Sequence, residues 1–370
     1  MNMKSFVSCA IGAAAALAVC DAAVAADFYA GKTVTFMNGA EAGGSSSISC
    51  RMLGEHLQRV IPGNPKFIVK NMPSESGIAA NNFVGLQVKK DGLTMTCGAY
   101  GPAFQLFGEP NLKVDLTKFN IISGNGDSDV LYMSSDVAPG LKTGEDIFSL
   151  PPGKLTFGGI AYNTQKDVKA RAILKAYGID NYKYVTGFNG DSAGRAAIQQ
   201  KFIGLYTEAA NAYIGITANA LVKTGQAIPV AQSGQLDESG KRIRDPRMPD
   251  IPTYAELYEK HFGKPATGLL WDLIATISAH QNVAGRWVAL PPDSPPEAIA
   301  IMRKAIDDLN KDPAFLADAA KLRGEGIAAK EWPGAIVQAR LDAYLHMPPE
   351  MLKLFNELVE EGDKRQTNAK

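Results

Sequence analysis

Hydrophobic and polar residues alternate along the first part of the chain in two patterns, one typical of strands and one typical of helices. Short apolar runs predict strands at 33–37, 67–69 and 93–97. Apolar residues at helical spacing predict helices over 48–60 and 79–88, between those strands. Strands separated by helices are typical of parallel strands joined by right-handed crossovers, so the sequence predicts an α/β fold.

The same pattern begins again in the middle of the chain. Strands are predicted at 154–157 and 182–185, each followed by a glycine-containing loop and then by a helix, over 165–177 and 192–201. This repeated order predicts two small α/β lobes of similar plan. Further helices are predicted over 297–309, from 313 onward, over 331–345 and over 349–360.

The N-terminus has the features of a secretory signal peptide. Lys4 precedes an Ala-rich apolar run from Phe6 to Cys20, and Ala23-Val24-Ala25 supplies the small residues that a signal peptidase recognises. The run is shorter than the roughly 20 apolar residues that a membrane span needs. We therefore expect residues 1–26 to be a cleaved signal peptide and the mature protein to lie in the periplasm.

Charge and composition exclude several classes of function. The 370 residues include 38 Lys and Arg against 38 Asp and Glu, so the chain lacks the basic excess of a nucleic-acid-binding protein. The four histidines are not spaced as metal ligands, and no glycine motif for a nucleotide occurs, so neither a metal nor a cofactor is expected. The segment 237–250 carries both signs of charge and is interpreted as a solvated surface loop.

Two cysteines, Cys50 and Cys97, remain once the signal peptide is removed. An oxidising compartment would allow a disulfide between them. Two buried free thiols fit the sequence equally well, because the sequence does not give the distance between the two α-carbons.

Three loops that precede predicted helices have the composition of an anion-binding site. A helix N-terminus presents unpaired N–H groups and the positive end of the helix dipole, and glycines let a ligand approach the backbone. The alternative is that each loop is only a turn with a helix cap. The candidate ligand-binding residues of these loops are Gly43, Gly44, Ser45, Ser46, Ser47, Asn163, Thr164, Phe188, Asn189 and Gly190. Tyr100 and Gly101, which follow the third strand, are expected to form one wall of the site, and Asn211 is a further candidate contact.

One segment also matches the pattern of a serine hydrolase. Residues 190–194 read G-D-S-A-G and lie between a predicted strand and a predicted helix, as a nucleophile elbow requires. Asp250 or Asp272, followed by His280, would complete the order Ser, Asp, His around Ser192. An exported serine hydrolase is therefore an alternative function. The competing interpretation is that the glycines make a tight turn and that Ser192 caps the helix.

Short motifs follow one another in a fixed order along the mature chain. They are Ala42–Arg51 (AGGSSSISCR), Asn71–Gly77 (NMPSESG), Lys90–Thr94 (KDGLT), Gly187–Gly190 (GFNG), Met248–Thr253 (MPDIPT) and Lys311–Phe315 (KDPAF). In this order they resemble the motifs of the substrate-binding receptors of tripartite tricarboxylate transporters, the Bug or TctC family.

The resemblance implies a two-lobed periplasmic receptor of Venus-flytrap form that is not an enzyme. Lobe 1 would combine residues 27–125 with 229–370, and lobe 2 would be residues 126–228. Such a receptor is expected to be a monomer that captures a small organic carboxylate and delivers it to the membrane subunits of a transporter. A periplasmic ligand-sensing partner of a membrane receptor is an alternative use of the same fold.

Departures from the family pattern bear on the ligand. Ser47 stands where the family has Asp, which favours an anionic or neutral ligand end over an amine. Gly204 stands where the family has an acidic residue. Tyr162, Tyr100 and Phe188 either place aromatic rings at the cleft, which would suit a planar or aromatic carboxylate, or lie at an exposed rim.

Overall fold

The computed structural model describes residues 28–43, 45–73, 77–98, 103–106, 108–188, 190–237, 239–325 and 329–368. The expected signal peptide lies outside the described residues, and so do Gly44, Tyr100, Gly101 and Asn189. Within the described ranges, no helix combines the length and the apolar character needed to cross a membrane.

The chain divides into two compact units, which are described separately. Unit 1 consists of Met1–Asn125, Arg286–Leu322 and Ala329–Gln338. Unit 2 consists of Gly126–Gly285, Arg323–Ala328 and Ala339–Lys370.

These units differ from the lobes expected from the sequence in the assignment of residues 229–285, 323–328 and 339–370. All three stretches belong to unit 2, whereas the expected lobe 1 included them. The physical reason is packing: β9 (Ala227–Gln232) pairs with β5 (Asp129–Ser134), and helices later in the chain pack on α5 (Gln165–Ala176).

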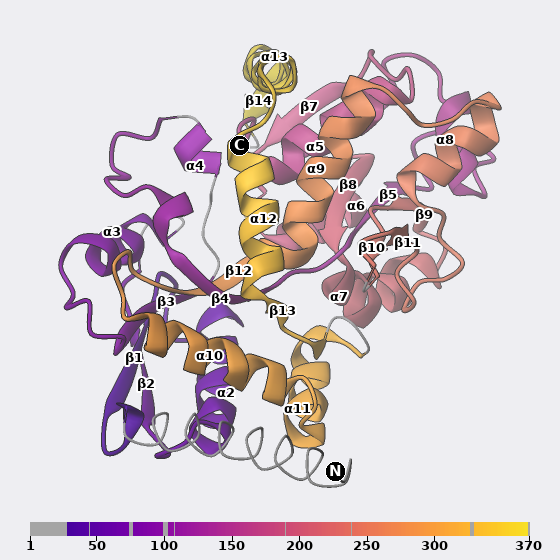
Figure 1. Cartoon of the computed structure of the whole chain (residues 1–370). Coiled ribbons are helices and arrows are strands. Elements are labelled where there is room, and N and C mark those ends of the chain that lie inside the picture. The colour runs from indigo at the N-terminus through magenta and orange to yellow at the C-terminus, as the bar shows by residue number, and fades with distance from the viewer. Residues whose placement is uncertain are drawn as a thin grey trace, which may run out of the picture. The chain divides into compact units, whose positions relative to one another are not determined.

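A six-stranded sheet of order β13-β4-β12-β3-β1-β2 forms the centre of unit 1 (Figure 1). β1 is parallel to β2 and to β3, and the pairs that involve β12 or β13 are antiparallel. The strands are β1 (Thr33–Asn38), β2 (Lys66–Asn71), β3 (Thr94–Gly98), β4 (Asn120–Asn125), β12 (Arg286–Leu290) and β13 (Trp332–Pro333).

The helices of unit 1 bury their apolar faces against this sheet. Val34 and Phe36 of β1, Leu57 of α2 and Met302 of α10 belong to one buried core. The strands predicted at 33–37, 67–69 and 93–97 and the helices that follow the first two of them are confirmed to within a few residues at their ends. The helices are α2 (Ser45–Val60), α3 (Ile78–Leu86), α4 (Ala103–Leu106), α10 (Pro296–Leu309) and α11 (Pro313–Arg323), whose last residue belongs to unit 2.

Unit 2 contains a second six-stranded sheet, of order β14-β7-β6-β8-β5-β9. β6 is parallel to β7 and to β8, β14 is parallel to β7, and β5 is antiparallel to β8 and β9. The strands not yet given are β6 (Thr156–Gly158), β7 (Lys183–Thr186), β8 (Leu205–Ala209) and β14 (Gln366–Asn368), and a small hairpin is formed by β10 (Gln235–Leu236) and β11 (Arg242–Ile243).

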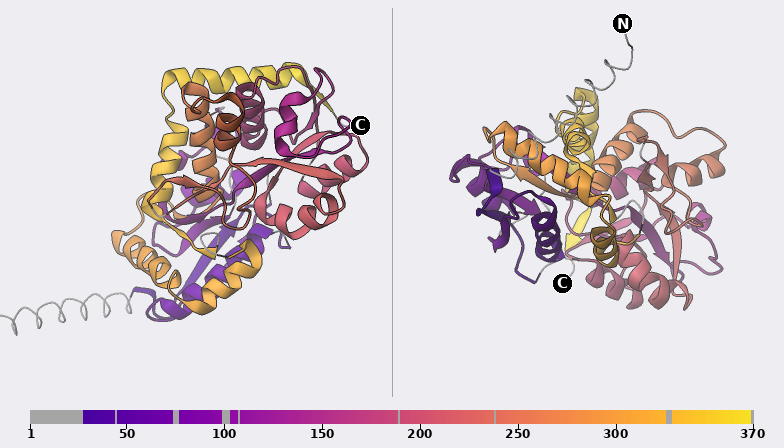
Figure 2. Two further views of the ribbon diagram at one scale, coloured as in Figure 1. Left: turned by 90° about the vertical axis from the view of Figure 1, so that its right-hand side faces the viewer. Right: turned by 60° about the horizontal axis from the view of Figure 1, so that its bottom comes forward.

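Long helices cover the sheet of unit 2. The C-terminal helix α13 (Pro349–Arg365) packs on α5 and α9 (Leu269–Ala284), and the chain then enters β14 beside β7 (Figures 1 and 2). A predicted helix over 331–345 begins later than expected, at Gly334, because Trp332–Pro333 pairs with β4 as a strand. The helices are α6 (Asp191–Gln199), α7 (Ala210–Ala212), the π-helix η4 (Tyr213–Val222), α8 (Tyr254–Phe262), α9 (Leu269–Ala284), α12 (Gly334–Leu345, which runs from unit 1 into unit 2) and α13 (Pro349–Arg365).

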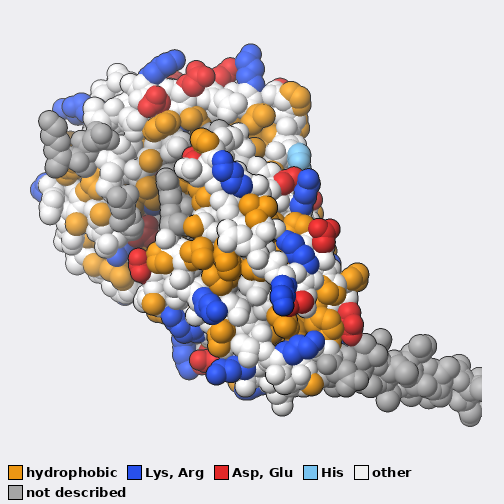
Figure 3. Space-filling model, turned by 90° about the vertical axis from the view of Figure 1, so that its left-hand side faces the viewer, with side chains coloured by type: hydrophobic (Ala, Val, Ile, Leu, Met, Phe, Trp, Pro, Cys, Tyr) orange, Lys and Arg blue, Asp and Glu red, His pale blue; other side chains and the backbone are white. Residues whose placement is uncertain are grey.

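Charged side chains of both signs are dispersed over the face shown in Figure 3, with hydrophobic side chains between them. This mixed surface agrees with the zero formal net charge of the chain.

Candidate functional site

The topology of unit 1 marks one edge of its sheet as a place for a ligand. The chain leaves β1, forms α2, and returns to pair as β2 on one side of β1; it then forms α3 and returns as β3 on the other side. The strand order therefore reverses between β1 and β3. In open α/β sheets, ligands bind outside the carboxyl ends of the strands at such a reversal, and here the N-terminus of α2 follows the carboxyl end of β1.

Asn38, the last residue of β1, holds the start of α2 in place. Its side-chain Nδ2 donates to the Cys97 carbonyl at 2.6 Å and to Ser46 Oγ at 3.0 Å, and its Oδ1 accepts from the Ala40 N–H at 2.8 Å. Gly98 lies against this cluster, because a Cβ there would come within 2.7 Å of Asn38 Nδ2. The end of β1, the end of β3 and the first turn of α2 are thus joined through one amide.

A disulfide between Cys50 and Cys97 strengthens the same junction. The two α-carbons lie 6.0 Å apart, so α2 is covalently tied to β3. Of the two states that the sequence allowed, the disulfide is therefore the one that the structure shows.

Asn71, at the end of β2, fixes the loop on the other side. Its Nδ2 donates to the Ala40 carbonyl at 2.7 Å and to Ser47 Oγ at 2.9 Å. Ser46 and Ser47 are both buried, with exposed fractions of 7% and 0%. Their hydroxyls, expected from the sequence to face a ligand, are instead bonded to Asn38 and Asn71 inside unit 1.

Gly43 remains exposed in the loop before α2, with no atom within 4 Å of the position a Cβ would take. The loop is held from the other side by Arg51, whose Nη1 donates to the Ala42 carbonyl at 2.9 Å. The first turn of α2 contains no acidic residue. An anion that approaches this helix start would therefore meet the positive end of the helix dipole without a competing carboxylate in that turn.

The helix starts in unit 2 are chemically different. The strand order reverses there between β6 and β8, and α5 begins after the loop that follows β6. Asp167, fully buried in the first turn of α5, accepts from the Ala161 N–H at 3.1 Å and from the Tyr184 hydroxyl at 2.7 Å. Burial raises the pKa of Asp167, while its hydrogen bond from Tyr184 opposes that rise.

A carboxylate of the protein itself therefore fills the inner side of the loop before α5. Gly159 makes room for it, since a Cβ on this residue would lie 2.1 Å from Asp167 Oδ2. Thr164 caps α5, with its Oγ1 accepting from the Asp167 N–H at 3.4 Å and donating to the Ala161 carbonyl at 3.1 Å. Asn163 is half-buried, and its side chain makes no hydrogen bond to another described residue.

Glu208 is an acidic residue that the sequence analysis did not single out. It is fully buried near the carboxyl end of β8, whereas Gly204, where the resemblance had drawn attention to a missing acid, directly precedes that strand. Its carboxylate accepts from Thr217 Oγ1 at 2.5 Å and forms an ion pair with Arg195. Burial raises the pKa of Glu208, and the bonds from Thr217 and Arg195 act in the opposite direction.

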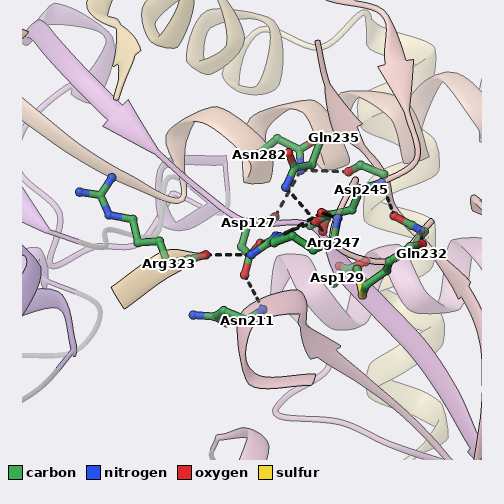
Figure 4. Close-up of polar contacts among 12 residues, drawn as sticks. Asp127, Asp129, Asn211, Gln232, Gln235, Asp245, Arg247, Asn282 and Arg323 are labelled. Atoms are coloured by element: carbon green, nitrogen blue, oxygen red, sulfur yellow. Dashed lines mark hydrogen bonds and ion pairs between the residues drawn. The ribbon is translucent and has the colours of Figure 1, made fainter. Parts of the chain in front are cut away.

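The remaining predicted residues of unit 2 do not come together as one group. Phe188 is 7% exposed and packs in the hydrophobic core of unit 2. Gly190 precedes α6 with a φ of 99°, and Asp191 places an acid in the first turn of that helix. Asn211 is exposed; its backbone N–H donates to Asp127 Oδ2 at 2.9 Å, while its side-chain amide points away from that carboxylate (Figure 4).

The interpretation of 237–250 as a solvated loop is wrong for its central residues. Asp245 is fully buried and accepts from Gln235 Nε2 at 2.8 Å, and Arg247 bridges Asp245 and Asp127 (Figure 4). Burial opposes ionisation of Asp245, but the hydrogen bonds from Arg247 and Ser128 outweigh it, so the pKa of Asp245 lies below its ordinary value. The segment is folded into unit 2 by these buried charges.

The hydrolase constellation is not assembled among the described residues. Ser192 is exposed, as are Asp250 and Asp272. His280 is buried instead, with its Nδ1 3.1 Å from Gln165 Nε2 and its ring centroid 4.7 Å from that of Tyr344. Burial lowers the pKa of His280 to about 3, which does not suit a general base at neutral pH.

Comparison with solved structures identifies the fold. A TctC solute binding protein from Polaromonas, with no ligand, matches with a TM-score of 0.63 and 17% identity over 90% of this chain and 99% of that chain. An R. palustris protein with adipate matches with a TM-score of 0.57 and 16% identity, over 88% and 98% of the two chains. MatC from Rhodopseudomonas palustris, with bound malate, matches with a TM-score of 0.54 and 16% identity, over 89% and 99%.

No protein-family model and no curated protein sequence matches the chain. Its assignment therefore depends on the arrangement of its strands and helices, which extends over nearly the full length of these solved structures. The α/β fold class expected from the sequence is confirmed: the chain has the fold of the TctC periplasmic solute-binding proteins.

Proposed function

We propose that the mature protein is a periplasmic receptor of the Bug or TctC family that binds a small organic carboxylate reversibly. It delivers this ligand to the membrane subunits of a tripartite tricarboxylate-type transporter. The support is the fold, together with the adipate and the malate that two proteins of the same fold carry. The ordered series of motifs in the sequence agrees with this assignment.

The observation that carries the proposal is the start of α2. It lies at the strand reversal of unit 1, its first turn holds no acid, and Asn38, Asn71 and the disulfide fix its position. Uncharged N–H groups in a rigid setting bind a carboxylate without a reorganisation cost. We assign the ligand carboxylate to this helix start, with Gly43, Gly44 and the backbone of Ser45–Ser47 as the donors.

Unit 2 contributes weaker candidates. The side chains of Thr164 and Asn211 make hydrogen bonds within unit 2. The Asn163 amide makes no hydrogen bond to a described residue and is therefore the better candidate to contact a ligand. Gly190 and Asn211 are accessible but lie beside the carboxylates of Asp191 and Asp127. Tyr100, Gly101 and Asn189 stay in the proposal on the sequence alone.

A thermal-shift series tests the binding of carboxylates. The purified protein would be heated with malate, adipate, benzoate and acetate, since a ligand that binds only the folded state raises the melting temperature. A rise that saturates with concentration for at least one carboxylate is expected. No rise with any of them at millimolar concentration would overturn the proposal.

A matched pair of variants tests the position. Gly43→Asp places a carboxylate in front of α2, whereas Gly43→Asn adds the same volume without the charge, and neither meets an atom within 4 Å at Cβ. We expect Gly43→Asp to weaken carboxylate binding at least tenfold and Gly43→Asn to change it much less. Equal affinities for the two variants would refute the assignment to α2.

Transport needs its own measurement. Uptake of the bound carboxylate would be followed in cells that express the transporter subunits, with wild-type protein or with Gly43→Asp. Uptake that does not depend on this protein would contradict delivery to the transporter. The protein would then be a carboxylate-binding protein with another partner, such as a membrane sensor.

A further inference from the structure

Unit 2 contains a cavity whose lining residues are not among those assigned to the proposed ligand site. Its volume is about 290 Å³, and it is bordered by α9, α12 and the hairpin of β10 and β11. Small side chains on α9 and α12, among them Ala279 and Ala343, leave the space open, and Arg242, Arg340 and Thr276 supply its polar groups.

We call this cavity the arginine pocket, after Arg242 and Arg340.

The two arginines of the arginine pocket are held differently. Arg242 is anchored, because its Nη1 donates to the Ser233 carbonyl at 2.7 Å and lies 3.3 Å from Asn282 Oδ1. Arg340 is half-buried and makes no hydrogen bond or ion pair with a described residue. Its guanidinium therefore has donors to offer, beside a second guanidinium that is fixed in position.

The charge around the arginine pocket is not balanced by the protein. None of its described lining residues is acidic. Asp129 attracts Arg242, but its carboxylate is already paired with Lys169 and accepts from the Tyr254 hydroxyl at 2.7 Å. Burial and the repulsion of Arg340 lower the pKa of Arg242 to about 10, against the attraction of Asp129, so Arg242 stays charged at neutral pH.

We propose that the arginine pocket binds a small oxyanion, a phosphate or a carboxylate, between Arg242 and Arg340. A guanidinium presents its N–H groups in a planar fork that matches the oxygens of such an anion, and the Thr276 hydroxyl adds a further donor. The volume is at the lower end of the range for ligand pockets, which favours an ion of a few heavy atoms. This inference does not rest on the proposed function, because its residues are separate from those at α2.

Titration calorimetry with inorganic phosphate at low ionic strength tests the inference. Arg340→Gln removes one guanidinium without breaking a hydrogen bond to any described residue, so this variant is expected to stay folded. Lys154→Gln is the matched control, since Lys154 is an exposed cation of unit 2 that makes no side-chain hydrogen bond or ion pair with a described residue. We expect Arg340→Gln to weaken phosphate binding at least tenfold and Lys154→Gln to change it less than twofold.

Succinate, titrated into protein that carries Gly43→Asp, distinguishes a carboxylate from a phosphate, because that change suppresses the site proposed at α2. Binding of either anion that is lost in Arg340→Gln supports the inference and identifies the class. Binding of phosphate and succinate that is unaffected by Arg340→Gln, or no binding of either anion, would overturn it.

Discussion

Removing the disulfide should destabilise the protein by an amount that the structure allows us to estimate. The bridge joins Cys50 and Cys97, which are 47 residues apart. Closing a loop of that length lowers the conformational entropy of the unfolded chain, which raises the free energy of the unfolded state by about 4 kcal/mol at 25 °C. Because both side chains are buried, we use alanine in the double variant Cys50→Ala/Cys97→Ala, which leaves no unpaired hydroxyl in the core. We expect the free energy of unfolding to fall by about 2–4 kcal/mol.

Urea denaturation measures this difference, with the wild type and the double variant each unfolded with and without a reducing agent. The reductant should destabilise the wild type and leave the double variant unchanged. If α2 is the proposed carboxylate site, the variant should also bind a carboxylate less tightly, since α2 is no longer tied to β3. A loss of stability below about 1 kcal/mol would refute the argument from loop closure.

Three further changes test other parts of the structure. Gly98→Ala should lower the free energy of unfolding by about 1–3 kcal/mol, because the new Cβ would lie 2.7 Å from Asn38 Nδ2 and the residue has a φ of 152°. Gly43→Ala is the control and should leave stability unchanged, since no atom lies within 4 Å of its Cβ position. Chemical denaturation of both variants makes the comparison. Burial lowers the pKa of His280 to about 3 in the folded state, against 6.5 in the unfolded chain, so the unfolded state takes up a proton first as the pH is lowered. The free energy of unfolding of the wild type should therefore fall by about 2 kcal/mol between pH 7 and pH 5 because of this group. The variant His280→Gln should not show this loss. Lys169→Met leaves the buried Asp129 carboxylate without its ion-pair partner and should lower the free energy of unfolding by about 3–5 kcal/mol. Lys353→Met removes an exposed pair and should lower it by less than about 0.5 kcal/mol. Similar losses for both variants would contradict the role of burial.

The order of strands and helices could be read from the sequence because apolar periodicity reports local structure. The elements around β1, α2 and β2 were found in this way. Helix α9 was not, since ten of its residues are buried and its apolar residues surround it too evenly to show one face. The unit to which residues 229–285 belong was also out of reach, because it depends on the packing of α9 against α5.

Parts of the candidate site were predictable for the same local reason. The glycine and serine loop before α2 could be found from composition, but the direction of the Ser46 and Ser47 hydroxyls depends on Asn38 and Asn71, which come from two different strands. Asp245 was misread because a charged segment is usually solvated, and only the fold brings Arg247 against it. A polar residue at the end of an apolar run, such as Asn38, is the signal that could have indicated these contacts.

The acid in the first turn of α5, and its absence from the first turn of α2, has a consequence for selectivity. Each unit has a helix that starts at its strand reversal, but only α2 lacks an acidic residue in its first turn. Under the proposed function, a ligand carboxylate that approached the start of α5 would meet the buried Asp167 side chain, which already accepts from the Ala161 N–H at 3.1 Å. A monocarboxylate with an uncharged far end should therefore rank with, or above, a dicarboxylate of equal length.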